Sequence, residues 1–285
     1  MGSLEDILVE LIRRASTVAP RSLKDALQRE LDRAEDPVAR SQLETILRNI
    51  RLAEENSKPI CQDTGILNFI FEIGEDHPTP RNLRLTVENA VKRATELIPL
   101  RPNAVDLYKG NTGNNVGLHV PWITVQLVPG DKMRICCFPK GGGSSNVAKL
   151  GMLNPGEGLK GVKRFVLESV LEAGPKGCPP YIVGVGVGGG EDIAMILAKK
   201  ALLRPVGSWS SRPEVAKLER ELLTLINRLG IGVMGLGSGP TALSVHVEVA
   251  ARHPASLPVA VAFSCWALRY AWVEIDRDGE ARFIE

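Results

Sequence analysis

The stretch from residue 181 to residue 203 constrains the fold most strongly. Its first ten residues, Tyr181–Gly190, contain no charged side chain and alternate valine with glycine before a final glycine run. This pattern is typical of a buried strand that ends in a glycine turn. The residues that follow, Glu191–Leu203, predict a helix. A buried strand that leads directly into a helix indicates a fold that combines sheet with helices.

The glycines of this strand also resemble a cofactor-binding pattern. Gly184, Gly186 and Gly189 match the G-x-G-x-x-G spacing of dinucleotide-binding proteins. However, the first two glycines fall inside the predicted strand. No acidic residue ends a second strand about 20 residues later, where a dinucleotide-binding unit would place it. We therefore do not expect the chain to bind NAD.

Helices and strands are predicted on both sides of this stretch. Residues 1–56 form a helical section, in which Ser3, Ser22 and Ser41 each begin a Ser-x-x-acid pattern typical of a helix start. Further helices are predicted at 83–98, 158–171 and 214–229. Strands are predicted at 67–74, 122–127, 132–138, 241–250 and 257–263. We therefore expect a mixed α/β fold, in which a helical N-terminal section is followed by mixed sheets flanked by helices. A single domain would span residues 1–285.

Composition and charge exclude several classes of protein. The 285 residues are 24% charged with a net charge of +2, which gives no indication of a nucleic-acid or membrane partner. No apolar run approaches the roughly 18–20 residues that span a bilayer. The cysteines, five in all, are too few and odd in number for a disulfide scaffold. Because the N-terminus also has no apolar core for secretion, we expect a cytoplasmic protein.

The cysteines fall into two groups. Cys61, Cys178 and Cys265 lie far apart in the sequence, and the absence of a C-x-x-C pair excludes zinc-finger and ferredoxin spacings. Three distant thiolates can still converge in a fold. If they hold a [4Fe–4S] cluster, one iron has no protein ligand and can act on substrate as a Lewis acid. The adjacent Cys136 and Cys137 lie in a predicted strand, and we interpret them as packing residues.

The residues next to the first cysteine are polar. Gln62, Asp63 and Thr64 directly follow Cys61, on a loop that closes at Gly65. An amide, a carboxylate and a hydroxyl are thus presented together with a soft thiol. On this stretch alone, a polar turn around a buried cysteine is an equally good interpretation.

Three other positions carry polar groups on predicted loops. Arg101 lies between two prolines just past a helix, although its position alone fits an exposed surface arginine. The glycines at 141–143 supply backbone N–H groups that suit a carboxylate or phosphate, or else form a flexible loop. His253 precedes a proline and is near Cys265 in the sequence, which makes it a candidate for chemistry. By contrast, we expect His246 to be a core residue of a strand.

Taken together, the motifs resemble the alpha-type catalytic domain of the iron–sulfur hydro-lyases, the family of class I fumarate hydratase and L(+)-tartrate dehydratase. The resemblance extends from about Lys58 to the strand after Cys265. Each motif alone is unspecific, but the set is highly specific. The motifs are Cys61–Gly65 (CQDTG), Gly141–Asn146 (GGGSSN), Gly177–Pro180 (GCPP), Val183–Gly186 (VGVG), and Ala251–Ser256 (ARHPAS) with Cys265–Trp266 (CW).

The resemblance implies a [4Fe–4S] cluster and the residues around it. The implied cluster ligands are Cys61, Cys178 and Cys265. The implied substrate-binding residues are Gln62, Arg101 and, through its backbone, Gly142. Asp63 with His253 would act as the acid that protonates the departing hydroxyl. The planar guanidinium of Arg101 would bind a carboxylate.

The resemblance also implies a partner chain. In single-chain members of the family, a beta-type domain follows this one and supplies the proton-abstracting base. The sequence ends at Glu285, so we expect an alpha subunit whose beta subunit carries that second domain. The expected enzyme is a hetero-oligomer of alpha and beta chains that acts on a C4 dicarboxylate. The alpha chain alone would have little or no activity.

The glycine run favours one substrate over another. Its GGGSSN sequence is closer to the fumarase pattern, whereas we expect a cysteine-containing run after the glycines in tartrate dehydratases. We therefore expect reversible dehydration of L-malate to fumarate, with dehydration of L(+)-tartrate as the alternative. A non-catalytic cluster-binding subunit and a glycine-loop nucleotide binder are more remote alternatives. The polar residues Gln62 and Asp63 beside Cys61 argue against both.

Overall fold

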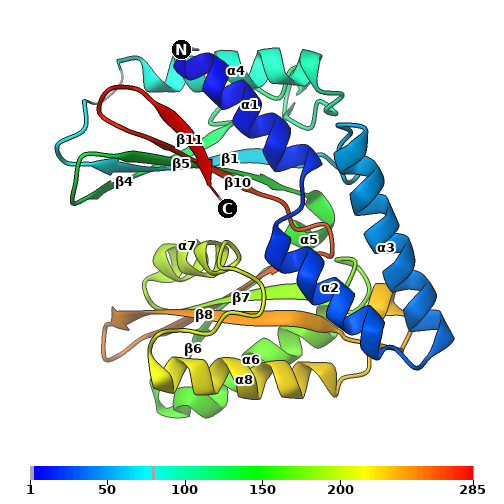
Figure 1. Ribbon diagram of the computed structural model, residues 1–285. Coiled ribbons are helices and arrows are strands. Elements are labelled where there is room, and N and C mark those ends of the chain that lie inside the picture. Colours follow the sequence, from blue (N-terminus) through cyan, green and yellow to red (C-terminus); the bar gives the residue numbers. More distant parts are fainter. Residues whose placement is uncertain (1–2, 79–80, 285) are drawn as a thin grey trace. The chain divides into compact units, whose positions relative to one another are not determined.

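The computed structural model describes residues 3–78 and 81–284 (Figure 1). They divide into two compact units. Unit 1 comprises the described residues of Met1–Pro20, Asn49–Gly142 and Arg269–Glu285, and unit 2 comprises Arg21–Arg48 and Gly143–Leu268. Each unit has its own sheet and its own apolar core. The expectation of a single domain over the whole chain stays a prediction.

Unit 1 is built on a five-stranded mixed sheet with the order β11-β10-β5-β1-β4. Its strands are β1 (Ile66–Gly74), β4 (Trp122–Val128), β5 (Met133–Lys140), β10 (Ala271–Ile275) and β11 (Ala281–Ile284). β4 runs parallel to β1, and the remaining neighbours are antiparallel. The first three strands were predicted. Strands β10 and β11 were not predicted, and neither was the short hairpin of β2 (Val105–Asp106) and β3 (Gly110–Asn111).

Two helices cover one face of this sheet. They are α1 (Leu4–Thr17) and α4 (Leu83–Leu97), drawn above the sheet in Figure 1. Alternate residues of β1, such as Phe69 and Phe71, point to that face and are fully buried in the core of unit 1. A capping box of Ser3 and Asp6 begins α1, as the Ser-x-x-acid pattern predicts. The amphipathic helix pattern thus places the apolar stripe of α1 in this core.

The helical N-terminal section is divided between the two units. α2 (Arg21–Arg33) belongs to unit 2, and α3 (Pro37–Glu55) begins in unit 2 and ends in unit 1. The predicted helix start at Ser41 is wrong. α3 begins earlier because the Asp36 carboxylate accepts two backbone N–H groups of its first turn. Proline at the first helical position suits this start, since its missing N–H would have had no intrahelical partner.

Unit 2 contains a four-stranded sheet with the order β6-β9-β7-β8. Its strands are β6 (Lys149–Leu153), β7 (Tyr181–Gly189), β8 (Ala242–Arg252) and β9 (Leu257–Ser264). β7 and β8 are parallel, and β9 is antiparallel to both β6 and β7. Only β6 was not predicted.

Helices cover both faces of the sheet of unit 2. On one face, α6 (Gly158–Ala173) and α8 (Pro213–Asn227) pack against alternate valines of β7 in the core of the unit. α7 (Glu191–Ala201) lies on the other face (Figure 1). The mixed α/β fold with flanking helices is therefore confirmed. No helix within residues 3–78 and 81–284 is long and apolar enough to cross a membrane.

Two glycines of β7 allow α7 to lie directly on the strand. A Cβ atom at Gly186 would be 1.9 Å from the carbonyl oxygen of Ala194, and one at Gly184 would be 2.1 Å from the carbonyl oxygen of Ala198. Neither position has room for a side chain, because the obstacle is the helix backbone itself. Helix-on-strand packing therefore accounts for two glycines of the G-x-G-x-x-G spacing.

The core assignments made from the sequence are confirmed. His246 is fully buried on β8, where its ring nitrogens lie 2.8 Å from the Ser244 hydroxyl and 3.0 Å from the Ala201 carbonyl oxygen. Burial lowers the pKa of this histidine to about 4. Cys136 and Cys137 are fully buried on β5, and burial raises the pKa of both thiols. These side chains are packing residues.

Candidate active site

The loop between α3 and β1 presents Cys61 from a fixed backbone. The preceding residue, Ile60, is buried. Its N–H donates to the Ser16 carbonyl at 3.1 Å, and its carbonyl accepts from the Asn49 side-chain amide at 2.8 Å. Cys61 is half-buried and Gln62 is exposed. The thiol is therefore accessible, while the chain beside it is anchored inside unit 1.

Asp63 holds this loop against the glycine run. Its carboxylate accepts the Gly65 N–H at 3.0 Å and the Gly142 N–H at 2.7 Å. A Cβ atom at Gly141 would lie 2.9 Å from the same carboxylate, so a larger residue there would displace Asp63 from this position. The buried guanidinium of Arg269 donates to the Asp63 carbonyl. The structure thus brings Asp63 and Gly142, two of the predicted site residues, into direct contact.

The glycine run does not form the flexible loop that was one of its two interpretations. A short helix, α5 (Gly142–Asn146), begins there directly after β5. The backbone N–H of Gly142, which the resemblance assigns to substrate, donates to Asp63 in this structure. A substrate carboxylate that uses this N–H must therefore share it with Asp63 or displace it.

Arg101 follows α4 on a loop that is tied to the Cys61 loop. Its N–H donates to the Thr64 hydroxyl at 3.1 Å, and its carbonyl accepts from the Asn115 side-chain amide at 2.9 Å. Arg101 is nevertheless an exposed residue. Among the described residues, no carboxylate or other acceptor bonds to its guanidinium. Unit 1 thus carries an available cation on a loop whose main chain is bonded to Thr64, the residue after Asp63.

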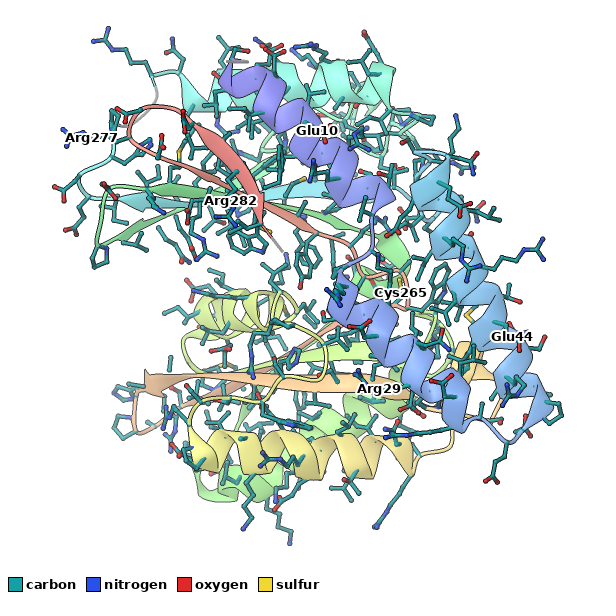
Figure 2. All side chains as sticks on the ribbon, viewed as in Figure 1. Glu10, Arg29, Glu44, Cys265, Arg277 and Arg282 are labelled. Atoms are coloured by element: carbon teal, nitrogen blue, oxygen red, sulfur yellow. The ribbon has the colours of Figure 1, made fainter. Side chains whose placement is uncertain are left out.

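Unit 2 brings together the other two predicted cluster ligands. Cys178 precedes β7 in the chain, and Cys265, which is labelled in Figure 2, follows β9. Because these strands are antiparallel neighbours, both cysteines lie at the same end of the sheet. The Cys178 carbonyl accepts the Trp266 N–H at 3.3 Å. Burial raises the pKa of Tyr181 to about 12, and the nearby thiols of Cys178 and Cys265 also raise it.

The loop that carries Cys178 has an unusual backbone conformation. The Tyr181 hydroxyl donates to the Gly174 carbonyl at 2.7 Å and accepts the Gly177 N–H at 3.0 Å, which closes the loop. Cys178 itself has φ +58°, in the left-handed region. That conformation costs a residue with a Cβ atom roughly 1–2 kcal/mol. Strain of this kind is concentrated at functional sites.

His253 lies at the opposite end of the sheet of unit 2. It belongs to the turn between β8 and β9, whereas Cys265 follows the far end of β9. The eight residues of β9, Leu257–Ser264, span roughly 26 Å as an extended strand. Closeness in sequence to Cys265 therefore does not place His253 near it, because a whole strand separates the two residues. His253 is exposed, and its Nδ1 accepts the Ala255 N–H at 3.1 Å. Its catalytic role stays a prediction.

The residues that would hold a cluster are divided between the units. Cys61 belongs to unit 1, and Cys178 and Cys265 belong to unit 2. Within the described residues, no three Cys, His, Asp or Glu side chains form a ready metal site. The donors nevertheless fit an iron–sulfur cluster chemically, since thiolates are its usual ligands. All three thiols are exposed or half-buried, unlike those of Cys136 and Cys137.

Comparison with known proteins decides the family. The sequence profile of the fumarate hydratase (Fumerase) family matches residues 5–274. The chain belongs to the fumarate hydratase (Fumerase) family. The resemblance inferred from the motifs is therefore confirmed, and the chain is a member of a hydro-lyase family.

Two named relatives match this Fumerase-family chain along nearly its whole length. A Methanocaldococcus jannaschii protein provisionally named L(+)-tartrate dehydratase subunit alpha is 43% identical over 282 residues, which cover 97% of this chain and 99% of the relative. The L(+)-tartrate dehydratase subunit alpha of Escherichia coli strain K12 is 36% identical over 280 residues, which cover 98% of this chain and 92% of the relative.

Several residues that shape the candidate site of this Fumerase-family chain were not predicted as site residues, although Thr64 was noted as the hydroxyl next to Asp63. Their shared feature is that they bind the main chain of a predicted site residue or of its loop. They are Thr64, Asn103, Asn115, Tyr181 and Arg269. The only signal in the sequence is their position inside or close to the motifs or, for Asn115, at the end of the polar run Asn111–Asn115.

Removal of the Tyr181 hydroxyl tests its role in closing the Cys178 loop. We expect Tyr181→Phe to lower the free energy of unfolding of the cluster-free chain by about 1–3 kcal/mol, because the Gly177 N–H would lose its buried acceptor. Urea denaturation measures this difference. The control is Tyr108→Phe, at a tyrosine that is 92% exposed, which we expect to change stability by less than about 0.5 kcal/mol. Equal stability of the Tyr181→Phe and wild-type chains would contradict this role.

The left-handed conformation of Cys178 gives a second prediction. In the cluster-free chain, we expect Cys178→Gly to be more stable than Cys178→Ala by about 1 kcal/mol, because glycine adopts this φ without steric cost. Cys265 is outside the left-handed region, so there the alanine variant should be the more stable one by about 0.5–1 kcal/mol. Thermal or urea unfolding of the four variants checks the expected inversion. The same order at both positions would show that the strain is not real.

Proposed function

We propose that the chain is the alpha subunit of an iron–sulfur hydro-lyase that dehydrates a four-carbon hydroxydicarboxylate, with L(+)-tartrate as its substrate. The observation that carries the substrate is the similarity to relatives named L(+)-tartrate dehydratase subunit alpha, which covers 97–98% of this chain. The family profile supports the reaction class.

The cofactor of this proposal is a [4Fe–4S] cluster held by Cys61, Cys178 and Cys265. When bound, it would supply an iron that acts as a Lewis acid on the hydroxyl group of the substrate. The support from this chain is the chemistry and accessibility of the three thiols, together with the approach of Cys178 and Cys265 at one end of the sheet of unit 2.

Residues of unit 1 would bind and protonate the substrate. Arg101 would bind a substrate carboxylate through its available guanidinium, and Gln62 and the Gly142 N–H would contact the substrate beside it. Asp63 would give a proton to the departing hydroxyl, which is otherwise a poor leaving group. Support comes from the contact between Asp63 and Gly142 and from the anchored loop beneath Arg101.

His253 is proposed as the partner of Asp63 in acid catalysis on the strength of the family resemblance. Its turn lies at the far end of β9 from Cys265. The Nδ1 atom accepts a backbone N–H, which leaves Nε2 as the atom that carries the proton in the neutral ring. That nitrogen is the one available for chemistry. Any role of His253 would therefore use Nε2.

The proposal includes a beta subunit. The relatives are named as alpha subunits, which supports a second chain in the enzyme. We propose that this partner supplies the base that removes the C–H proton next to the substrate carboxylate. The alpha chain alone would then hold the acid, the carboxylate-binding arginine and the cluster thiols, but it would not complete the reaction.

Dehydration of L-malate to fumarate is the second candidate. Two observations favour it: the name of the matching family, and the glycine run GGGSSN, which is closer to the fumarase pattern. The two reactions differ by one hydroxyl group on the substrate. The same residues of this chain would serve both.

A substrate panel tests these candidates. The chain is produced without oxygen together with its beta subunit, loaded with iron and sulfide, and assayed with L(+)-tartrate and with L-malate. We expect kcat/KM for tartrate to exceed that for malate by at least about tenfold, since a site built for a second hydroxyl rejects a substrate that lacks it. Preference for malate would establish the second candidate. If a cluster-loaded complex dehydrates neither acid, the non-catalytic subunit becomes the correct interpretation.

A further inference from the structure

The main chain around Arg101 is held by a buried network of polar side chains. The Thr64 hydroxyl, 3% exposed, accepts the Arg101 N–H and an N–H of the Asn103 side chain, both at 3.1 Å. The Asn103 side chain also donates to the Gly65 carbonyl at 3.2 Å. The loop at 101–103 is therefore bonded directly to the segment that follows Asp63.

Asn115 completes this network. It is 4% exposed and makes three side-chain hydrogen bonds. Its Oδ1 accepts the Asn103 N–H at 2.6 Å, and its Nδ2 donates to the Arg101 carbonyl at 2.9 Å and to the Thr95 hydroxyl at 3.1 Å. Thr95 lies on α4. Asn115 therefore connects the Arg101 loop to a helix of the core.

The backbone conformation of Asn115 explains why asparagine suits this position. Its φ is +61°, in the left-handed region that glycine and asparagine adopt most readily. Glycine would keep the backbone but would provide none of the three bonds. Glutamine carries the same amide on a longer side chain and would be strained at this φ. The position thus combines a backbone requirement with a hydrogen-bonding requirement.

The main chain of Arg101 is held by hydrogen bonds within the described residues, whereas its guanidinium is not. The residue is exposed, and no described residue provides an acceptor for its side chain. An anchored main chain below an available guanidinium is the arrangement that bidentate carboxylate binding requires, because both N–H···O bonds depend on orientation. A loop without an anchor would lose conformational entropy each time that substrate binds, which would weaken binding.

We propose that Asn115 is a positioning residue for Arg101 and, with Thr64, fixes the loop that presents its guanidinium to a substrate carboxylate. This inference rests on the proposed function, in which Arg101 binds that carboxylate. Asn115 does not touch the substrate. It acts through the Arg101 carbonyl and the Asn103 N–H. Loss of its side chain should therefore weaken substrate binding more than it slows the chemical step.

The test uses the cluster-loaded complex of the alpha and beta subunits. For Asn115→Gly, we expect KM for the preferred dicarboxylate to rise about tenfold while kcat changes by less than about threefold. The matched control is Asn82→Gly, because Asn82 also has a left-handed φ (+56°) but makes no side-chain capping bond. This control should keep both constants within twofold of wild type.

A double-mutant cycle separates positioning from general loosening. In an Arg101→Ala background, Asn115→Gly should raise KM by less than about twofold, because the guanidinium that Asn115 positions is gone. A tenfold rise that persists without Arg101 would overturn the inference. So would a KM for Asn115→Gly equal to that of the wild-type enzyme.

Two variants at Thr64 test the inference independently, in case Asn115→Gly fails to fold. Thr64→Ser keeps the hydroxyl and should keep KM within about threefold, whereas Thr64→Val has the same shape without the hydroxyl and should raise KM about tenfold. Equal KM values for these two variants would overturn the inference. If the wild-type complex itself dehydrates neither tartrate nor malate, the proposed function fails and the inference falls with it. An active wild-type enzyme with unchanged Asn115→Gly and Thr64→Val variants refutes the inference alone.

Discussion

Asp63→Asn should lower kcat of the alpha–beta complex by about 10²–10⁴-fold, because general acid catalysis contributes that much and an amide cannot give up a proton. The asparagine has nearly the same shape and keeps one of the two acceptors that bind the Gly65 and Gly142 N–H groups. One of these donors would lose its partner, at a cost of about 1–3 kcal/mol of stability. Steady-state kinetics, with iron content measured in parallel, separates a loss of chemistry from a loss of cluster.

A matched control for this variant is Asp278→Asn. Asp278 is an exposed carboxylate in unit 1, on the turn between β10 and β11, and its side chain has no role in the proposed site. Its conversion to an amide should leave kcat within twofold of wild type. If Asp63→Asn keeps kcat within threefold of wild type while it retains the cluster, Asp63 is not the acid, and it only anchors the glycine run.

Gly186→Ala should destabilise unit 2 strongly, although it adds only one methyl group. The new Cβ would lie 1.9 Å from the Ala194 carbonyl oxygen and 2.8 Å from the Ala198 nitrogen, so the backbone of α7 must move away from β7. Overpacking of this kind costs typically 1–3 kcal/mol, and a clash with helix backbone belongs at or above the top of that range. We therefore expect a loss of about 3–5 kcal/mol, measured by urea denaturation of the cluster-free chain.

Gly143→Ala is the control for this substitution. A Cβ at Gly143 would find its nearest neighbour, the Lys176 carbonyl oxygen, at an ordinary contact distance of 3.6 Å. We expect its stability to stay within about 1 kcal/mol of wild type, since alanine is also the better helix former in α5. Comparable stability of the two variants would mean that α7 does not lie on β7 as closely as the structure shows.

The fold could be predicted where a local pattern specifies an element. The uncharged run Tyr181–Gly190 and the apolar periodicity of α1 both form the predicted elements. β6, β10 and β11 were missed because they are short and lie at or near the sheet edges, where alternation is weak. The division of the helical section between two units was also not predicted. It depends on tertiary contacts that local periodicity does not encode.

In the candidate site, residues that carry reactive groups were predicted from the sequence, whereas residues that hold them in place were not. Cys61 and Asp63 were predicted as site residues because reactive groups stand together in one motif. Asn115 was not predicted as a site residue, since its three bonds reach residues 12 to 20 positions away in the chain. For His253, closeness in sequence to Cys265 does not mean closeness in the fold, because β9 separates the two residues. Such supporting residues can be recognised only from the three-dimensional structure.

The most direct test of the account measures iron content and turnover of serine variants of the three proposed ligands. The complex is assembled without oxygen, and the Cys61→Ser, Cys178→Ser and Cys265→Ser variants are compared with Cys136→Ala, a change at a buried cysteine outside the proposed site. We predict about four irons per alpha chain and dicarboxylate dehydration in the wild type and in Cys136→Ala. Each serine variant should lose both. A Cys61→Ser enzyme that keeps its iron and its turnover would contradict the central claim that these three thiols hold the catalytic cluster.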